Sequence, residues 1–401
     1  MTAKRIHFIM STEPCKQNCD ETSRHSARSL YVHVPLCLSK CRYCDFYSLP
    51  LDPQAAGRFV RMVSRELDLH RDCLARPLET LFIGGGTPTA LGAGLLTELL
   101  AALRPLINDR TEFSVEANPG TFDDSVALVL AQGGVNRVNF GVQSFRDSEL
   151  RVLGRIHNAR QAGEAVRLAR SRGFARVGLD LIYGIPGQSP EDWQDNLRQA
   201  MELGIDHLSC YALSFEPRTP LGQDLARGAV TEMPEQEQKA CYHSTIDLVG
   251  EAGFEHYEIS NFARPGARCR HNLTYWRNET YLGLGPAAAS YIDTVRRTNR
   301  PDLPAYLLAL ESNSPPPADC ETLPLRGRMA ETVMLGLRLI EGLDRRAFAQ
   351  RFGMDPLEAF PQSIHRYADQ GALLITPSHV RLAHWALFVC DTILADIISE
   401  A

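Results

Sequence analysis

Three cysteines lie close together near the amino end of the chain and could bind metal. Cys37, Cys41 and Cys44 form a CxxxCxxC motif directly after a strand-like run that ends at Pro35. Three thiolates on one loop suit a four-iron cluster, because they hold three irons and leave the fourth open to a small molecule. Zinc sites are usually closed by four protein ligands, and no clean second pair sits at a suitable distance here. The spacing therefore favours an iron–sulfur cluster over a zinc site or three inert thiols.

A glycine-rich segment, GGGTP at residues 84–88, could hold the molecule that meets the open iron. No Lys-Ser/Thr pair follows it, so it is not a phosphate loop. Its glycines let backbone N–H and C=O groups approach the amino and carboxylate groups of a bound amino acid. S-adenosylmethionine (SAM) carries such groups, and an electron from the cluster can cleave its carbon–sulfur bond. A strand-to-helix turn without a ligand is the alternative.

Two acidic residues end apolar, strand-like runs further along the chain. Glu116 lies in SVEANPG and Asp180 in GLDLIYGIPGQ. A buried carboxylate without a partner is costly, so we expect both acids to contact a ligand, with ribose hydroxyls as their partners. Gln143 and Arg155 could support the same ligand. For Arg155, a solvated surface arginine is a nearly equal alternative.

One histidine stands out for its aromatic neighbours. His271 lies in HNLTYW, beside Tyr275 and Trp276. A neutral imidazole there could ligate haem iron or stack beside a porphyrin. The alternative is a hydrogen-bonded core histidine, and the residues alone favour this second interpretation.

The elements that must position these residues alternate along the chain. Strands are expected at residues 30–34, 79–83, 112–116, 137–141, 176–182 and 207–212, with helical patterns between them. This alternation predicts parallel βαβ units and an α/β fold, a partial (β/α)6 TIM-like barrel. Several strands are apolar at nearly every position, as when both faces are covered. In such barrels the active site lies at the carboxyl ends of the strands, so we expect the motifs above to lie together at that end of the barrel.

The remaining segments define the domain organisation. We expect a flexible extension over residues 1–28, the barrel over 29–215, an extension with the HNxxYW motif over 216–312, and a carboxyl-terminal domain over 320–401. Residues 270–291 should make tight turns, and NSPPPA at 313–318 is typical of a linker. The last domain, helices followed by a small hairpin, is winged-helix-like and α+β. Its polar face lacks a basic stripe, so a DNA-binding regulator with the cluster as its sensor is the least favoured hypothesis.

Composition indicates an ordinary globular protein. With 44% hydrophobic residues, 22% charged residues and a net charge of -6, the chain is not expected to bind nucleic acid through bulk positive charge. No apolar run reaches the roughly 18 residues that span a bilayer, so we do not expect an integral membrane protein. The amino end fits neither a secretory signal nor a transit peptide, which predicts a cytoplasmic location.

The other cysteines do not form a second motif. Eleven cysteines in 401 residues are not a disulfide scaffold. Six are scattered and are expected to be buried or incidental thiols: Cys73, Cys210, Cys241, Cys269, Cys320 and Cys390. Cys15 and Cys19 form a CxxxC in a polar tail without a preceding strand, and we do not assign them to a site.

Taken together, seven motifs resemble one family. They are YVHVPLCLSKCRYCDF, IGGGTPT, EANPG, GVQSF, LGRIH, DLIYGIPGQ and HNLTYW. In this order they are similar to the radical SAM family of oxygen-independent coproporphyrinogen III oxidase-like proteins, and within it to the HemW branch of haem chaperones. The resemblance runs from about Leu30 to the carboxyl end, and implies a radical SAM barrel followed by the winged-helix-like domain.

The resemblance also implies roles for individual residues. Cys37, Cys41 and Cys44 would bind a 4Fe–4S cluster. Nine side chains or backbone segments would contact the cluster or SAM: Tyr31, Tyr43, Gly85, Gly86, Thr87, Glu116, Gln143, Arg155 and Asp180. Ala212 matches a family SAM contact less closely. His271 belongs to a motif typical of the chaperone branch, which makes it the candidate for haem.

One departure separates the two branches. True oxidases read CxxxCxxCxC, and here Phe46 occupies the position of the last cysteine, after Asp45. The resemblance therefore implies a chaperone that binds haem and transfers it to apo-haemoproteins, with no catalytic residue assigned and no coproporphyrinogen oxidase activity. Oxidative decarboxylation of coproporphyrinogen III is the alternative. Ala386, where many relatives have glycine, affects only the expected hairpin geometry.

The same branch implies partners besides apo-haemoproteins. Other haem donors or acceptors, peripheral association with membrane haemoproteins and a homodimer all fit this interpretation. Nucleic acid is not among the expected partners.

Overall fold

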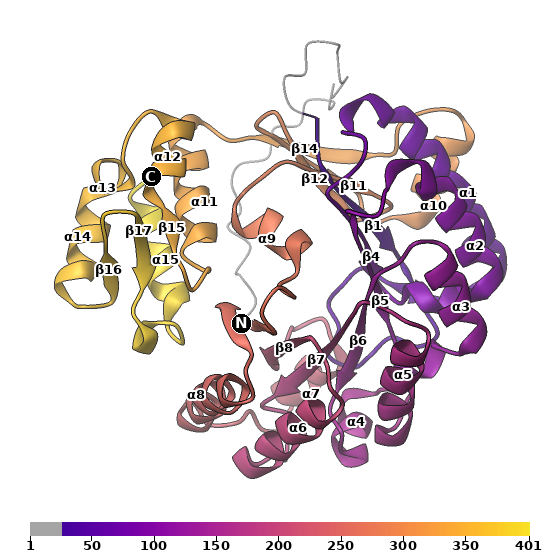
Figure 1. The fold of residues 1–401 in the computed structure, drawn as a ribbon, viewed down its shortest axis with the longest axis horizontal. Helices are drawn as coiled ribbons and strands as arrows, with labels where there is room; N and C mark the ends of the chain where they lie inside the picture. Colours follow the sequence, from indigo (N-terminus) through magenta and orange to yellow (C-terminus); the bar gives the residue numbers. More distant parts are fainter. Residues whose placement is uncertain (1–25) are drawn as a thin grey trace.

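The computed structural model describes residues 26–401, so Cys15 and Cys19 lie outside the described residues. One sheet organises the chain, in the strand order β14-β13-β12-β11-β1-β4-β5-β6-β7-β8-β10-β9. Its central strands are β1 (Ser29–Val34), β4 (Thr80–Gly85), β5 (Glu112–Ala117), β6 (Arg137–Gln143), β7 (Arg176–Tyr183) and β8 (His207–Ala212). Each pairs with the next in parallel, which confirms the predicted partial barrel (Figure 1).

Helices between these strands cover the outside of the sheet (Figure 1). They are α1 (Pro53–Leu69), α2 (Gly92–Leu103), α3 (Asp124–Gln132), α4 (Asp147–Leu153), α5 (Ala159–Ser171) and α6 (Pro190–Glu202). Their starts follow from local chemistry. The Asp52 side chain accepts a hydrogen bond from Ala55 N at the start of α1, and Ser189 forms a capping box with Asp192 at the start of α6. Such caps satisfy amide hydrogens that the first turn leaves free.

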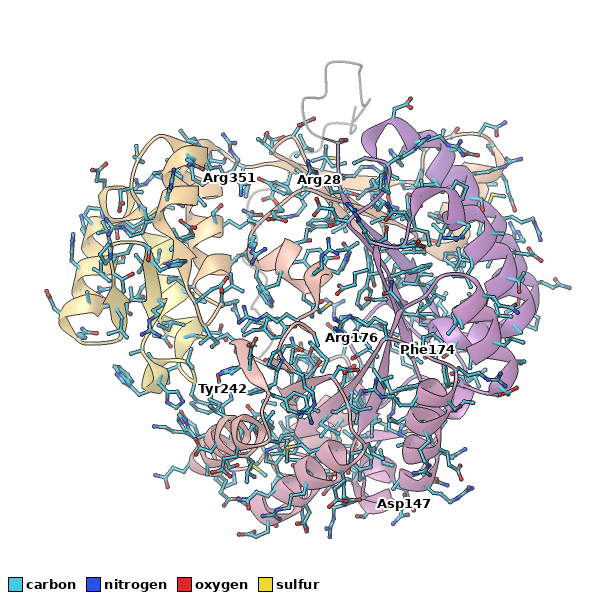
Figure 2. All side chains as sticks on the ribbon, in the orientation of Figure 1. Arg28, Asp147, Phe174, Arg176, Tyr242 and Arg351 are labelled. Atoms are coloured by element: carbon cyan, nitrogen blue, oxygen red, sulfur yellow. The ribbon has the colours of Figure 1, made fainter. Side chains whose placement is uncertain are left out.

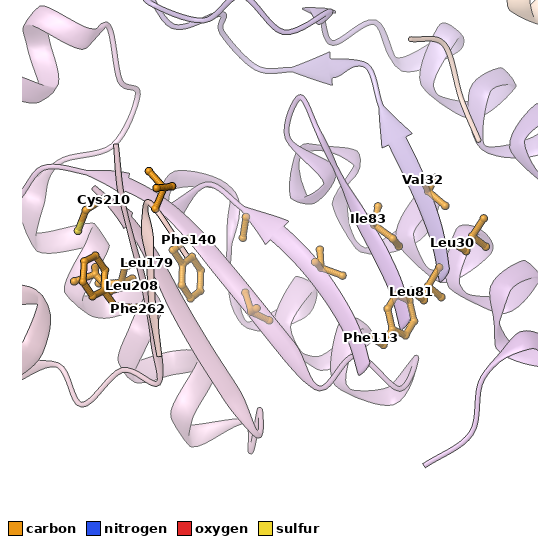
Figure 3. Close-up of a cluster of buried hydrophobic side chains, with 14 of the residues drawn as sticks. Leu30, Val32, Leu81, Ile83, Phe113, Phe140, Leu179, Leu208, Cys210 and Phe262 are labelled. Atoms are coloured by element: carbon orange, nitrogen blue, oxygen red, sulfur yellow. The ribbon is translucent and has the colours of Figure 1, made fainter. Parts of the chain in front are cut away.

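The central strands alternate in polarity, which corrects the expectation that both faces are apolar. Leu30, Val32, Leu81 and Ile83 are fully buried on the outer face, against the helices (Figure 3). The alternate positions face the interior of the barrel, and many of them are polar: Tyr31, His33, Ser114, Glu116, Asn139, Asp180 and Ser209. Successive side chains of a strand point to opposite faces. The interior of the barrel is therefore a polar lumen that can hold a ligand.

The chain beyond β8 extends the same sheet at both edges. β9 (Glu255–Glu258) and β10 (Asn261–Ala263) follow β8, while β11 (Tyr281–Leu284) pairs in parallel with β1 and continues into β12 (Ala289–Ile292), β13 (Val295–Asn299) and β14 (Ala318–Thr322). The accompanying helices are α7 (Pro220–Ala226), α8 (Glu235–Glu251), α9 (Arg270–Trp276) and α10 (Leu303–Glu311). Two short strands flank the cysteine loop, β2 (Leu36–Cys37) and β3 (Leu49–Pro50). Within residues 270–291, the expected tight turns occur only at residues 277–278 and 285–288, because HNLTYW forms α9 and β11 and β12 pair as strands.

Helix α9 lies across the amino ends of three central strands. Thr274 Oγ1 is 3.1 Å from Ser29 Oγ, and His271 Nδ1 is 2.8 Å from Thr80 Oγ1. The backbone N–H of His271 donates to Glu112 Oε1 over 3.1 Å. Ser29, Thr80 and Glu112 are the first residues of β1, β4 and β5. The HNLTYW segment therefore covers the end of the barrel opposite to the cysteine loop.

The carboxyl-terminal part forms a separate small sheet with helices beside it (Figure 1). Its elements are α11 (Leu325–Gly336), β15 (Leu343–Asp344), α12 (Arg345–Phe352), α13 (Pro356–Ala359), α14 (Pro361–Asp369), β16 (Leu373–Ile375), β17 (His379–Leu382) and α15 (Cys390–Ser399). The three strands pair antiparallel in the order β15-β17-β16. Helices followed by this antiparallel sheet give the predicted winged-helix-like domain.

One helical stretch in the described chain has the length and composition of a membrane span. It covers Pro88–Leu106, with a mean hydropathy of 1.2, and 44% of its apolar window is buried within the protein. A core helix of a barrel meets the same criteria, so a single stretch of this kind is weak evidence for a membrane span.

Candidate cluster and cofactor site

The cysteine loop is fastened to the barrel at both ends. Leu49 N donates to Pro35 O over 2.8 Å, and Leu51 N donates to Cys37 O over 2.8 Å. In the middle of the loop, Arg42 N donates to Leu153 O over 3.0 Å. These bonds join β2 to β3 and tie the loop to the end of α4. These hydrogen bonds therefore fix the backbone that carries the three cysteines.

Hydrogen-bond donors approach two of the three sulfurs. Thr87 Oγ1 lies 3.4 Å from Cys37 Sγ, and Arg155 Nη1 lies 3.0 Å from Cys41 Sγ. Donors of this kind stabilise thiolates, which are the form that ligates metal. Burial raises the pKa of the Cys37 thiol and raises the pKa of Cys44 to about 11. The Cys37 and Cys44 thiols hold their protons until a metal displaces them, and three thiol donors on one loop have the chemistry that an iron–sulfur cluster requires.

The glycine loop runs directly beside the segment that carries Cys37. Gly86 N donates to Val34 O and Thr87 N donates to Leu36 O, each over 2.8 Å. A β-carbon on Gly86 would lie 2.7 Å from Leu36 O, which is closer than the two atoms can approach. Gly85 also has a φ of 105°, which L side chains rarely adopt. Only glycine allows this loop to pack so closely against the cluster-bearing segment.

Two partly buried carboxyl groups lie in the lumen next to the glycine loop. Glu116 Oε2 accepts a hydrogen bond from Gly85 N over 2.9 Å, and Asp180 Oδ1 accepts one from Asn139 Nδ2 over 2.7 Å. Burial, together with the charge of Asp180, raises the pKa of Glu116 to about 8. Burial likewise raises the pKa of Asp180. Such carboxyl groups can accept hydrogen bonds from ligand hydroxyls, or donate one when protonated.

Gln143 and Arg155 join the same group of residues. Gln143 has a φ of 71°, a conformation that costs energy for a residue with a side chain, and its buried Oε1 has no hydrogen-bond partner in the described chain. Arg155 donates to Gly141 O as well as to Cys41. Arg155 is therefore not a solvated surface arginine. An unpaired amide oxygen in a polar lumen is a feature that a polar ligand would satisfy.

Aromatic residues lie in the lumen and on the cysteine loop. Tyr31 OH lies 3.0 Å from His33 Nδ1, and His33 Nε2 lies 2.9 Å from Tyr47 O. Tyr43 packs against a small apolar cluster that includes Leu153 and Ile185. Ala212 ends β8 beside Tyr183, at the carboxyl end of the barrel. The predicted residues other than His271 thus line the lumen or its carboxyl end.

His271 lies elsewhere, at the amino end of the barrel. Its side chain is 1% exposed, and burial lowers its pKa to about 3. Both ring nitrogens have partners, Nδ1 at 2.8 Å from Thr80 Oγ1 and Nε2 at 2.9 Å from Tyr275 OH. The ring also stacks on Phe82, with 5.1 Å between ring centroids. The sequence did not indicate this separation from the cluster loop.

Sequence reasoning also missed three polar residues in the lumen. His33, Asn139 and Ser209 contact Tyr31 or Asp180. Each stands two residues from another inward-facing position of its strand. The period-two alternation of β1, β6 and β8 was the signal that could have found them.

The chain matches two known domain families and is similar in sequence to heme chaperones. It matches the radical SAM superfamily over residues 31–200 and the HemN C-terminal domain over residues 323–388. The heme chaperone HemW of Bacillus subtilis (strain 168) is 31% identical over 377 residues, which cover 93% of this chain and 100% of that protein. The heme chaperone HemW of Escherichia coli (strain K12) is 40% identical over 266 residues, 65% of this chain and 69% of that protein.

A solved structure shares the fold. Coproporphyrinogen III oxidase (HemN) from Escherichia coli, a radical SAM enzyme, superposes with a TM-score of 0.82 at 22% identity, over 94% of this chain and 91% of that chain. At this identity the likeness concerns the fold alone.

The first prediction concerns Gly86. A Gly86→Ala change should push the glycine loop away from Leu36, at a cost of about 1–3 kcal/mol. We expect SAM affinity after anaerobic cluster reconstitution to fall about tenfold, with less bound iron. Gly94→Ala is the control, because a β-carbon there meets nothing within 4 Å. Equal SAM affinity and iron content in the two variants would contradict the close packing described above.

The second prediction concerns pH. The folded protein holds the Glu116 proton up to about pH 8, whereas the carboxyl of an unfolded chain releases it near 4.5. The unfolded state therefore binds fewer protons between these values, and the free energy of unfolding falls as the pH rises, by at most about 1.4 kcal/mol per pH unit for one site.

Glu116→Gln should flatten this fall in the cluster-free protein. Urea unfolding midpoints from pH 5 to 8 would measure it, with the exposed Glu98→Gln as the control. The same slope in all three proteins would show that Glu116 does not titrate in this range.

Proposed function

Because the chain belongs to the HemW family of radical SAM proteins, we propose that it binds haem and transfers it to apo-haemoproteins. The observation that carries this proposal is the match to a heme chaperone along the whole of that protein and 93% of this chain. It favours the chaperone over the coproporphyrinogen oxidase. Radical SAM membership implies a 4Fe–4S cluster and SAM as cofactors.

We assign the cluster to Cys37, Cys41 and Cys44. When bound, the cluster supplies the electron that SAM chemistry requires. Thr87 and Arg155 would orient two of the thiolates through the hydrogen bonds described above. Tyr31 and Tyr43 would pack beside the cluster or the adenine.

We assign SAM to the lumen beside the glycine loop. The amide hydrogens of Gly85, Gly86 and Thr87 are already used within the protein, so carbonyl oxygens of this loop would meet the methionine part. Glu116 and Asp180 would contact ribose hydroxyls. Gln143, Arg155 and Ala212 would complete the pocket, and binding would satisfy the unpaired Gln143 Oε1.

Phe46 is consistent with the chaperone branch. It stands where the oxidases carry a further cysteine, and its side chain is 70% exposed. Leu38, on the same loop, is 51% exposed. Exposed apolar side chains beside the cluster loop suit contact with a porphyrin face or an acceptor protein.

We retain His271 as the candidate haem contact, although iron ligation requires one of its ring nitrogens to lose its present hydrogen-bond partner. Ligation of iron through Nδ1 would require the ring to give up Thr80, and ligation through Nε2 would require it to give up Tyr275. Low basicity favours the neutral imidazole that iron needs. Haem binding at this residue would therefore involve local opening of α9.

The cellular setting is part of the same proposal. We propose a cytoplasmic protein whose partners are apo-haemoproteins and other haem donors or acceptors. A homodimer and peripheral contact with membrane haemoproteins would be compatible with such transfer.

One experiment separates the chaperone from the oxidase. The cluster is reconstituted anaerobically, SAM and reductant are added, and the same sample is tested with haem and with coproporphyrinogen III. We expect a haem complex that transfers to an apo-haemoprotein, and no protoporphyrinogen. Formation of protoporphyrinogen would overturn the proposal, and Cys37→Ser is the control for cluster dependence.

A separate prediction tests the haem contact. His271→Ala should weaken haem binding about tenfold, or ~1.4 kcal/mol, and shift the Soret band, because the iron loses a ligand. The exposed His365→Ala is the matched control. Unchanged affinity and spectrum in His271→Ala would remove His271 as a ligand, without affecting the chaperone assay above.

A further inference from the structure

An open surface pocket lies at the amino end of the barrel, on the side away from the cysteines. Its volume is about 490 Å³, a size that holds small ligands. Its lining comes from the starts of β5, β6 and β7, the turn before β5, and the segment that leads into α9. These residues are Asp109, Arg110, Thr111, Glu112, Asn136, Arg137, Arg176, Gly266, Arg268 and Arg270. We call this cavity the arginine basin.

The arginine basin is strongly basic in an acidic protein. Five arginines and two acidic residues line it, an excess of three positive charges, whereas the whole chain carries a net charge of -6. Arg110 and Arg176 form no ion pair within the described residues. Arg176 instead donates to Gly266 O over 3.2 Å, beside the segment that enters α9 (Figure 2). Their charges are thus available to a ligand.

Arg137 is the buried member of the basin. The residue is 3% exposed, and its Nη2 donates to Ala267 O at 2.8 Å, Arg268 O at 3.1 Å and Glu112 Oε2 at 3.2 Å. Its Nε and Nη1 have no partner in the described chain. A buried guanidinium with unused donors costs free energy, so a further acceptor would stabilise it.

We propose that the arginine basin binds an oxyanionic group with at least two negative charges, either paired carboxylates or a phosphate. Guanidinium groups pair with carboxylates and phosphates through two parallel hydrogen bonds, and several of them on one wall suit a multiply charged group. The two propionates of haem carry this chemistry, and so do free phosphate compounds. That haem propionates are the ligand rests on the proposed function, whereas the existence of an anion site does not.

The site is coupled to α9 through Glu112. This carboxylate accepts from Arg137 Nη2 and from the backbone N–H of His271. An anion that draws Arg137 toward itself weakens its pair with Glu112, one of the groups that hold the start of α9. The basin therefore adjoins the element whose opening haem ligation would require.

The test uses the full chain with two exposed or half-buried arginines changed, Arg110→Gln/Arg176→Gln, which spares the buried Arg137. The control is Arg160→Gln, an exposed arginine on α5 whose side chain is 72% accessible. Calorimetry with inorganic pyrophosphate, and absorbance titration with haem and with haem dimethyl ester, give the affinities. Urea midpoints confirm that the variants fold alike.

We expect the double variant to bind pyrophosphate about tenfold more weakly than wild type and control, since it loses two charged hydrogen-bonding groups. If propionates are the source, haem weakens similarly while the dimethyl ester binds wild type and variant equally. If the double variant loses affinity for pyrophosphate but not for haem, the anion site is supported and its ligand is a free phosphate compound. If the wild-type protein binds pyrophosphate but does not bind haem, the proposed haem-chaperone function is wrong, whereas the anion site in the arginine basin is supported. Pyrophosphate and haem affinities equal in all three proteins would overturn the basin and leave haem binding intact.

Discussion

Two backbone hydrogen bonds join the glycine loop to the segment that carries the first cysteine, and the site depends on them. They run from Gly86 N to Val34 O and from Thr87 N to Leu36 O. Because a β-carbon at position 86 would overlap the Leu36 carbonyl, only glycine lets the two segments lie this close. They continue the neighbouring strands β4 and β1. A pairing of strands thereby sets the loop assigned to SAM beside the loop assigned to the cluster.

Side chains alternate along each central strand between an apolar outer face and the polar lumen. Residues such as Leu30 and Ile83 pack outward on the helices, while Glu116 and Asp180 face inward. Partly buried carboxyl groups are tolerable there because Gly85 N and Asn139 donate to them, and removal from solvent shifts their pKa upward. The rigid outer face thus holds a set of polar groups that are only partly satisfied by the protein itself. Such an interior is prepared for a polar cofactor.

The two ends of the barrel differ in chemistry and are linked by aromatic rings. The carboxyl end carries the thiols, whereas the amino end carries α9 and the arginine basin. Between them, the Tyr31 ring lies 5.9 Å from the ring of His33 and 6.4 Å from that of His271. If haem and the cluster occupy the proposed sites, this row of rings lies between them. The barrel would then hold haem near one end of the sheet and the cluster with SAM near the other.

The sequence alone determined the features whose chemistry is local. The spacing of Cys37 to Cys44, the glycine loop and the strand–helix alternation each depend on residues close in the chain, and the fold agrees with them. Tertiary structure decided what depends on distant residues. His271 lies at the amino end because α9 packs on the starts of three strands, which its aromatic sequence did not reveal. Arg155 meets Cys41, and Arg110 and Arg176 share one cavity, only because parallel strands bring their like ends together.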